Sequence, residues 1–156
     1  MRRETLNRRR AAAATLAAAA FVGACTLPMA ATPPGLAGTT WQLVALQSMD
    51  DAQGTTRPAN PAAYQLRFGA DGRAALRVDC NRAMGTWQAT PAADGLSGSL
   101  QFGPLAGTRA MCPPGSLEPR LMRQLPFVRG YLLRDGQLHL SLMADGGILS
   151  WAPVAP

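Results

Sequence analysis

The chain has 156 residues with 15 arginines, 9 acidic residues and no lysine, which gives a formal net charge of +6 at pH 7. Five arginines and Glu4 lie before residue 25, so the rest of the chain carries ten arginines and eight acidic residues, a net charge of +2 without a basic cluster. This balance excludes the nucleic-acid-binding class, which depends on clustered cations that release counterions. About 130 residues remain, enough for one domain with a single core.

The N-terminal segment has the pattern of a secretory signal. Five arginines precede an uncharged, mostly small and apolar stretch over residues 11–24, which is too short to span a bilayer. The stretch ends in Val22-Gly23-Ala24-Cys25, the pattern of a bacterial lipoprotein cleavage box. We therefore predict a signal peptide over residues 1–24 and acylation of Cys25. The alternative is an ordinary secretory signal in which this cysteine is accidental.

The residues after the cleavage site predict a tether and a location. Residues 25–37 (CTLPMAATPPGLA) are small and proline-bearing without apolar periodicity, so we expect the acylated cysteine to be followed by a flexible linker of up to about 40 Å. The expected partner is the membrane, reached through the acyl chains. Thr26 stands where an inner-membrane retention signal places aspartate. We expect the periplasmic face of the outer membrane, in the envelope of a bacterium with two membranes.

The first strand is expected to begin near residue 41. Trp41, Leu43 and Ala45 fall on one face and Val44 and Leu46 on the other, and a strand that is apolar on both faces is typical of a central position. Residues 49–63 are polar with one glycine and two prolines, which predicts a loop.

Four Asp-Gly pairs predict an antiparallel meander, because Asp-Gly supplies the positive-φ positions of tight hairpins. Around them, apolar residues alternate with polar ones, which predicts strands with one buried face. The pairs begin at Asp71, Asp94, Asp135 and Asp145, and the expected buried sets are Tyr64, Leu66 and Phe68; Ala74, Leu76 and Val78; Leu96, Leu100 and Phe102; and Leu138, Leu140 and Leu142. A last strand is expected over residues 148–151.

One segment has a helical period. Ser116 is the expected N-cap, Leu117, Leu121 and Leu125 share one face, and Pro126 is expected to end the helix. The predicted fold class is mainly β (α+β): a curled antiparallel meander that forms a partial barrel-like sheet, with one amphipathic helix packed on it.

Three segments resemble the META domain (HslJ-like) family: residues 38–43 (GTTWQL), 79–87 (DCNRAMGTW) and 105–113 (LAGTRAMCP). The likeness extends over residues 38–153. It implies a compact, β-rich domain without known catalysis, found in envelope lipoproteins associated with stress and antibiotic tolerance. The chain departs from the family pattern where Asp79 replaces the usual glycine and Ala83 the usual aromatic residue. The signature positions, expected to be structural, are Trp41, Asn81, Gly85, Trp87, Thr108 and Glu118.

Cys80 and Cys112 are the two thiols that remain if Cys25 is acylated. An even pair in an oxidising compartment favours a disulfide, although two buried free cysteines are the alternative. Two cysteines without close spacing, with His139 the chain's one histidine, form no recognisable metal-ligand set, so no metal or cofactor is expected.

Several polar residues invite a functional interpretation, but structural ones are favoured. Asn81 is expected to satisfy backbone groups near a bend at Gly85. Thr108 and Arg109 could face an anion, or Arg109 could pair with Glu118. His139 lies on the polar face of a strand, and the three tryptophans are expected to pack in the core or at the barrel mouth.

These patterns predict a non-enzymatic, lipid-anchored envelope protein that acts through a protein surface in envelope maintenance or stress and antibiotic tolerance. An envelope protein is a possible partner, and no catalytic residue is identified. The alternative function is the binding of a small apolar ligand inside a barrel-like cavity, which a curled sheet can enclose.

Overall fold

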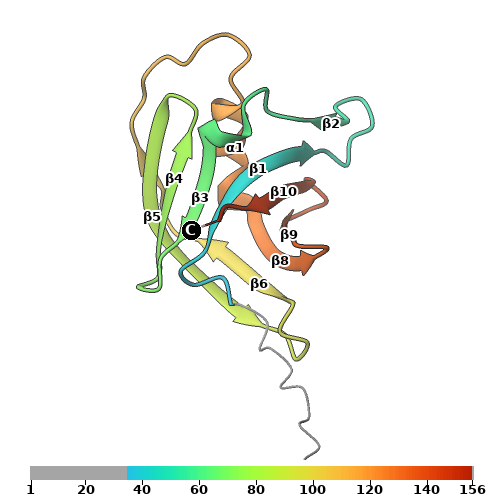
Figure 1. Cartoon of the computed structure of the whole chain (residues 1–156). Helices are drawn as coiled ribbons and strands as arrows, with labels where there is room; N and C mark the ends of the chain where they lie inside the picture. The colour runs from blue at the N-terminus through green and yellow to red at the C-terminus, as the bar shows by residue number, and fades with distance from the viewer. Residues whose placement is uncertain (1–34, 156) are drawn as a thin grey trace, which may run out of the picture. The chain divides into compact units, whose positions relative to one another are not determined.

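The computed structural model describes residues 35–155 and consists mainly of antiparallel strands (Figure 1). The predicted signal peptide, Cys25 and most of the predicted tether lie outside the described residues. The strands are β1 (Thr40–Gln47), β2 (Thr55–Thr56), β3 (Tyr64–Phe68), β4 (Arg73–Val78), β5 (Asn81–Pro91), β6 (Ser97–Phe102), β7 (Ala106–Gly107), β8 (Val128–Arg134), β9 (Gln137–Leu142) and β10 (Ile148–Pro153). The helical segments are η1 (Pro61–Ala63), α1 (Glu118–Gln124) and η2 (Leu125–Phe127).

Eight of these strands form a closed antiparallel barrel. The order is β10-β9-β8-β6-β5-β4-β3-β1, and β10 pairs with β1 to close the ring. The short strands β2 and β7 pair with β1 and β5 respectively. The predicted class, mainly β with one helix, is confirmed, and the sheet curls further than expected because its two ends meet.

The four Asp-Gly pairs all lie in hairpin turns, as predicted. They connect β3 to β4, β5 to β6, β8 to β9 and β9 to β10. Asp135 and Gly136 both have positive φ, 53° and 72°, which is the backbone of a two-residue turn whose twist matches that of the strands. Local turn chemistry therefore sets most of the meander.

The first strand has one core face instead of the predicted two. The register of β1 against β10 shifts between Leu43 and Ala45, so Val44 is the extra residue of a bulge. After the bulge Leu46 joins the core and Ala45 does not, although both are buried. The consecutive apolar residues from Leu43 to Leu46 thus arise because the bulge changes which alternate positions of β1 point into the core.

The predicted buried sets are confirmed except for one residue. Leu96 is 43% exposed because it belongs to the Asp94 turn and not to β6, which begins at Ser97. Four strands had no predicted counterpart: β2, which lies in the predicted loop over residues 49–63, and β5, β7 and β8. Strand β5 contains Gly85, and β8 has an irregular register between Val128 and Gly130.

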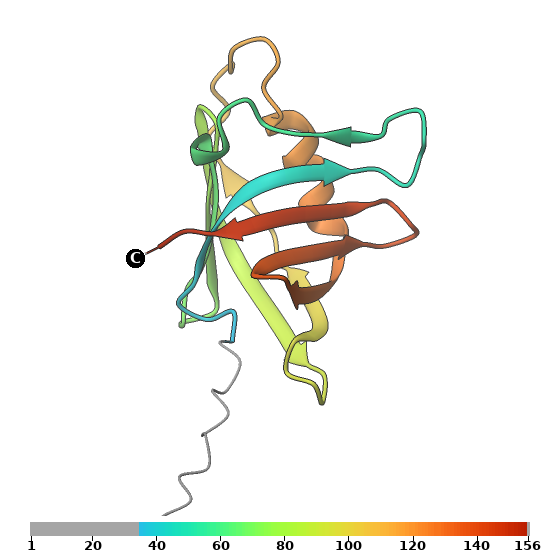
Figure 2. The same ribbon diagram turned by 45° about the vertical axis from the view of Figure 1, so that its right-hand side comes forward.

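The helix packs its leucines into the barrel, and Figure 2 shows it behind β1 and β10. Leu121 and Leu125 are fully buried, as predicted, and Leu117 is partly buried. Leu117, not Ser116, is the N-cap, although the Ser116 hydroxyl accepts a hydrogen bond from the amide of Glu118 (3.2 Å). Pro126 does not end the helical segment, because the chain tightens into η2 around it. Among residues 35–155, no helix is long and apolar enough to cross a membrane.

A single core fills the barrel. It begins at Leu36, which is 5% exposed although the sequence places it in the tether, and it ends at Trp151. Gly38 donates a backbone hydrogen bond to Phe68 (2.7 Å), which holds this first segment against the end of β3. The strands of the barrel therefore all follow the predicted tether, whereas the core also includes Leu36 from the end of that tether.

Candidate functional site

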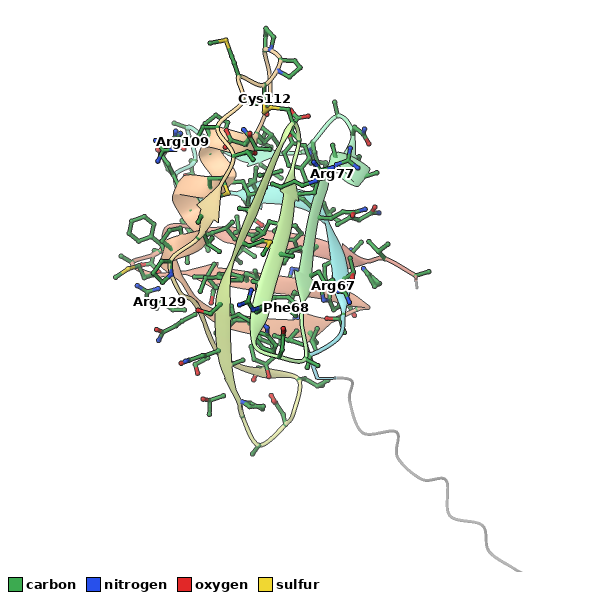
Figure 3. The ribbon with its side chains drawn as sticks, turned by 90° about the vertical axis from the view of Figure 1, so that its left-hand side faces the viewer. Arg67, Phe68, Arg77, Arg109, Cys112 and Arg129 are labelled. Atoms are coloured by element: carbon green, nitrogen blue, oxygen red, sulfur yellow. A yellow bond between two sulfur atoms is a disulfide. The ribbon has the colours of Figure 1, made fainter. Side chains whose placement is uncertain are left out.

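A disulfide joins Cys80 and Cys112, with an S–S distance of 2.00 Å and Cα atoms 5.4 Å apart. The predicted bond is confirmed. It connects the turn before β5 to the long loop between β7 and α1, at the end of the molecule where Figure 3 labels Cys112. Two of the three family-like segments, residues 79–87 and 105–113, are thus covalently linked.

Asn81 is the hydrogen-bonding centre beside this disulfide. Its side-chain oxygen accepts hydrogen bonds from the Thr108 hydroxyl and the Ala110 amide, both at 2.8 Å, and its amide nitrogen donates to the Ala110 carbonyl at 3.0 Å. Asn81 is 2% exposed, the one buried polar or charged residue among those described. The Asn81 side chain therefore supplies the hydrogen bonds that a neighbouring strand would otherwise supply to the loop after β7.

Thr108 continues the ladder that β7 begins. Its amide donates to the Arg82 carbonyl (2.9 Å), and its hydroxyl accepts from the Arg82 amide (3.1 Å) while donating to Asn81. Arg109 forms no ion pair with Glu118 within the described residues, and it is exposed.

Tyr64 fixes the opposite side of the same end. Its hydroxyl accepts a hydrogen bond from the Leu117 amide (2.9 Å) and lies 3.3 Å from a carboxylate oxygen of Asp79. Asp79 has a φ of 61°, the left-handed region that suits glycine, and aspartate is among the few other residues that tolerate it. The contact attaches the start of the helix to β3 and the β4–β5 turn. Sequence reasoning identified Tyr64 only as a core residue.

Gly85 lies within β5, opposite Ala74, and not at the bend that the sequence suggested. A Cβ atom at this position would lie 2.5 Å from the carbonyl oxygen of Pro104 and 2.7 Å from Leu105. Glycine is therefore required by the close approach of another backbone segment. Two residues on, Trp87 packs edge-to-face against Phe68, with ring centroids 4.9 Å apart, and donates to the Gly69 carbonyl (3.1 Å).

The barrel interior is occupied by side chains. Trp151, Leu121 and Leu125 are fully buried and belong to one core cluster, while Trp41 is 8% exposed and donates its indole N–H to the Thr39 hydroxyl (2.7 Å). Three surface hollows of about 380 to 410 Å³ lie open on the outer faces of the strands, and a smaller one of about 190 Å³ lies between the loops beside Tyr64, Asp79 and Ser116.

His139 lies opposite Ser150 on the outer face of β9 and β10, and its Nδ1 is 3.0 Å from the serine hydroxyl. It borders a shallow hollow of about 400 Å³ beside Tyr131, whose pKa is raised by burial and, to a smaller extent, by the charge of Asp94. Within residues 35–155 there is no group of three or more His, Cys, Asp or Glu side chains placed to hold a metal ion.

The outer face of β3, β4 and β5 carries four exposed arginines, and Figure 3 shows Arg67 and Arg77 along it. Arg77 and Arg82 are direct cross-strand partners, and Arg67 pairs with Ala75. The fourth, Arg73, has a carboxylate partner, Asp71, 4.0 Å away. Sequence reasoning identified some of these residues as solvent-facing but did not bring them together, because the register between strands is not visible in the chain.

Comparison with known proteins gives a family and a distant structural likeness. The META domain family model matches residues 34–153. No curated protein matches the chain. The chain resembles the crystal structure, at 1.00 Å resolution, of a DUF4847 family protein from Bacteroides vulgatus ATCC 8482, with a TM-score of 0.46 and 16% identity, covering 75% of this chain and 93% of that one. Since the family model covers nearly all of the described residues, the chain belongs to the META domain family.

Proposed function

We propose that this protein is a non-enzymatic, lipid-anchored envelope protein whose META barrel acts through its outer surface in envelope maintenance or in stress and antibiotic tolerance. The observation that carries the proposal is the filled barrel interior. Leu121 and Leu125 from the helical segment and Trp151 from β10 take up the space in which a barrel ligand would sit. A filled core leaves the outer surface as the part of the domain available to a partner.

The His139–Ser150 contact does not favour hydrolysis. A serine nucleophile needs a base that a third group orients and donors for the developing oxyanion. Here the two residues are direct cross-strand neighbours, a placement in which side chains of a sheet commonly form hydrogen bonds. Among the described residues, the Ser150 hydroxyl is the one partner that His139 has. The pair therefore supports the sheet.

The proposal that the domain acts through its outer surface is tested by measuring both the unfolding free energy and the binding of an apolar probe. Leu121→Ala is expected to cost about 2 to 5 kcal/mol of unfolding free energy, because it removes burial and leaves a cavity. Leu132→Ala, at a residue 39% exposed on β8, is the matched control and is expected to cost below about 0.5 kcal/mol. Urea unfolding gives both values. Saturable binding of the apolar dye N-phenyl-1-naphthylamine to the folded wild type would instead support the apolar-ligand function.

The lipid anchor is tested in cells. Cys25→Ser is expected to move the protein from the membrane pellet to the soluble fraction, because two or more acyl chains hold far more strongly than the domain alone. Thr26→Asp, the matched change next to it, is expected to keep membrane attachment but to shift the protein to the inner membrane. Mass analysis showing an unmodified Cys25 in the wild type would contradict the anchor.

A further inference from the structure

The arginines on the outer face of β3, β4 and β5 form a continuous cationic surface, here called the arginine face: Arg67, Arg73, Arg77 and Arg82. Strand alternation points all four outward, while Leu66, Leu76 and Ala83 between them point into the core. Three of the arginines border one hollow of about 380 Å³. An adjoining hollow of about 410 Å³ shares Arg67 and reaches Arg73 and Met84.

The arginine face has too little negative charge of its own. None of Arg67, Arg77 and Arg82 has a carboxylate within 4 Å among residues 35–155, and Arg73 has only an exposed partner at 4.0 Å. Like charges placed directly opposite each other destabilise an antiparallel pair, and Arg77 faces Arg82 in this way. Four of the ten arginines that follow residue 25 are therefore concentrated on one face, at a cost that an external anion would relieve.

The shape of this face favours an extended anionic surface over a single small anion. A built anion site gathers donors in a buried cradle, whereas all four of these side chains are exposed on a sheet. Met84 lies in the same face and is 57% exposed, so an apolar side chain is presented among the cations. Cations around an apolar residue match the headgroup region of a membrane.

The place where the chain enters the barrel also favours a membrane as the partner of the arginine face. Gly38 donates to the Phe68 carbonyl and Phe68 donates to the Thr39 carbonyl (2.9 Å), so the first described residues lie beside Arg67. Twelve residues, 26–37, separate Gly38 from Cys25, a reach of at most about 40 Å. An anchor at Cys25 would keep the domain within this reach of the bilayer, and the chain would enter the barrel beside the arginine face.

We infer that the arginine face binds the anionic phospholipid surface of the membrane to which the protein is attached, with arginines on phosphate groups and Met84 among the headgroups. This inference rests on the proposed surface function. It fixes which side of the barrel faces the lipid and leaves the opposite side, around β8 to β10, free for a partner.

Vesicle flotation tests the inference without the anchor. The protein is residues 25–156 with Cys25→Ser, which contain the whole barrel, and the vesicles are phosphatidylcholine alone or mixed with phosphatidylglycerol. Binding to the anionic vesicles only is expected, weakening as salt rises from about 0.05 M to about 0.5 M. The triple variant Arg67→Gln, Arg77→Gln, Arg82→Gln is expected to lower the partition coefficient about 100-fold, roughly fivefold for each cation near the surface.

Two matched triple variants control for charge and chemistry. Arg57→Gln, Arg123→Gln, Arg134→Gln removes the same charge outside the arginine face and is expected to change binding by less than about fivefold. The variant Arg67→Lys, Arg77→Lys, Arg82→Lys is expected to bind like wild type, because a membrane surface needs positive charge and not a bidentate fork. Melting curves confirm that each variant is folded.

Three outcomes would overturn the inference: equal binding to neutral and anionic vesicles, equal losses in the two glutamine triples, or binding to soluble poly-glutamate but not to vesicles, which would indicate an acidic protein partner. Because Cys25 is absent from every sample, failure here leaves the anchor untouched. Release of the Cys25→Ser protein in cells tests the anchor separately.

Discussion

The side chain of Asn81 on β5 and the hydroxyl of Thr108 after β7 are joined by a 2.8 Å hydrogen bond that connects the second and third family-like segments, residues 79–87 and 105–113. The same asparagine also bonds both backbone groups of Ala110. Buried at 2% exposure, Asn81 has all of these partners and adds a sulfur contact to Cys112 at 3.6 Å. Asn81 and the disulfide therefore hold the first part of the loop between β7 and α1, and Tyr64 holds its end at Leu117.

Asn81→Ala is expected to destabilise the protein by about 2 to 4 kcal/mol, because the Ala110 amide and carbonyl and the Thr108 hydroxyl lose their hydrogen bonds to a side chain that is 2% exposed. Urea unfolding measures the change. Thr108→Val removes the hydroxyl and is expected to cost about 1 to 2 kcal/mol, whereas Thr108→Ser, the matched control, keeps it and should cost less. Equal stability of Asn81→Ala and wild type would contradict the assigned role.

The disulfide closes a loop across a sequence separation of 32 residues. On the chain-entropy model a closed loop of this size contributes about 3 to 4 kcal/mol, so reduction is expected to lower the melting temperature by roughly 10 to 20 °C. Calorimetry with and without dithiothreitol measures the shift. The double variant Cys80→Ser, Cys112→Ser should melt near the reduced protein and ignore the reductant. A wild-type melting temperature indifferent to reductant would refute this prediction.

The sequence predicted those parts of the fold that short-range patterns determine. The four Asp-Gly turns and the alternating sets around Leu66, Leu76 and Leu140 need only neighbouring residues to specify them, and the structure contains them all. Leu96 was misplaced because it lies at the spacing of a buried residue, yet hydrogen bonds to Asp94 from the Leu96 amide and from the Ser97 amide and hydroxyl keep it in the turn.

The missed features depend on contacts between distant segments or on irregular backbone. The pairing of β1 with β10 joins the two ends of the domain, and no pattern of neighbouring residues in either strand predicts this pairing. Strand β8 was not predicted because its register shifts between Val128 and Gly130, which breaks the two-residue alternation of buried and exposed side chains. In β5, Gly85 was interpreted as a bend. The close approach of Pro104, which explains why glycine occupies this position, comes from a segment outside the strand. Likewise, the arginine face becomes visible only once the strand register is known.

Gly85→Ala is expected to cost about 1 to 3 kcal/mol of unfolding free energy, because the new methyl group meets a backbone oxygen that cannot move without shifting the segment from Pro104 to Leu105. Gly35→Ala provides the control, since a Cβ there has no neighbour within 4 Å. Thermal melting of the two variants side by side measures the difference. If Gly85→Ala were as stable as Gly35→Ala, the close approach would not be what requires glycine.

Asp94 gives a prediction for acidic pH. Hydrogen bonds from the Ser97 amide and hydroxyl, and then from the Leu96 amide, hold its pKa below the ordinary value of 3.8. A carboxylate whose pKa is lowered by folding stabilises the folded state above pH 3.8, and this contribution is lost as the pH falls through the lower folded value. The β5–β6 turn should therefore keep its hydrogen bonds at a pH where a free aspartate is half protonated.

The Asp94 carboxyl carbon, followed by NMR titration, is expected to give a midpoint below 3.8. Ser97→Ala removes the hydroxyl but leaves the amide, so it should raise the midpoint part of the way back towards 3.8. Ser99→Ala, on the same strand and away from the turn, should leave the midpoint where it is in wild type. A wild-type midpoint at or above 3.8, or an equal midpoint in the Ser97 and Ser99 variants, would show that the serine hydrogen bonds do not determine how Asp94 titrates.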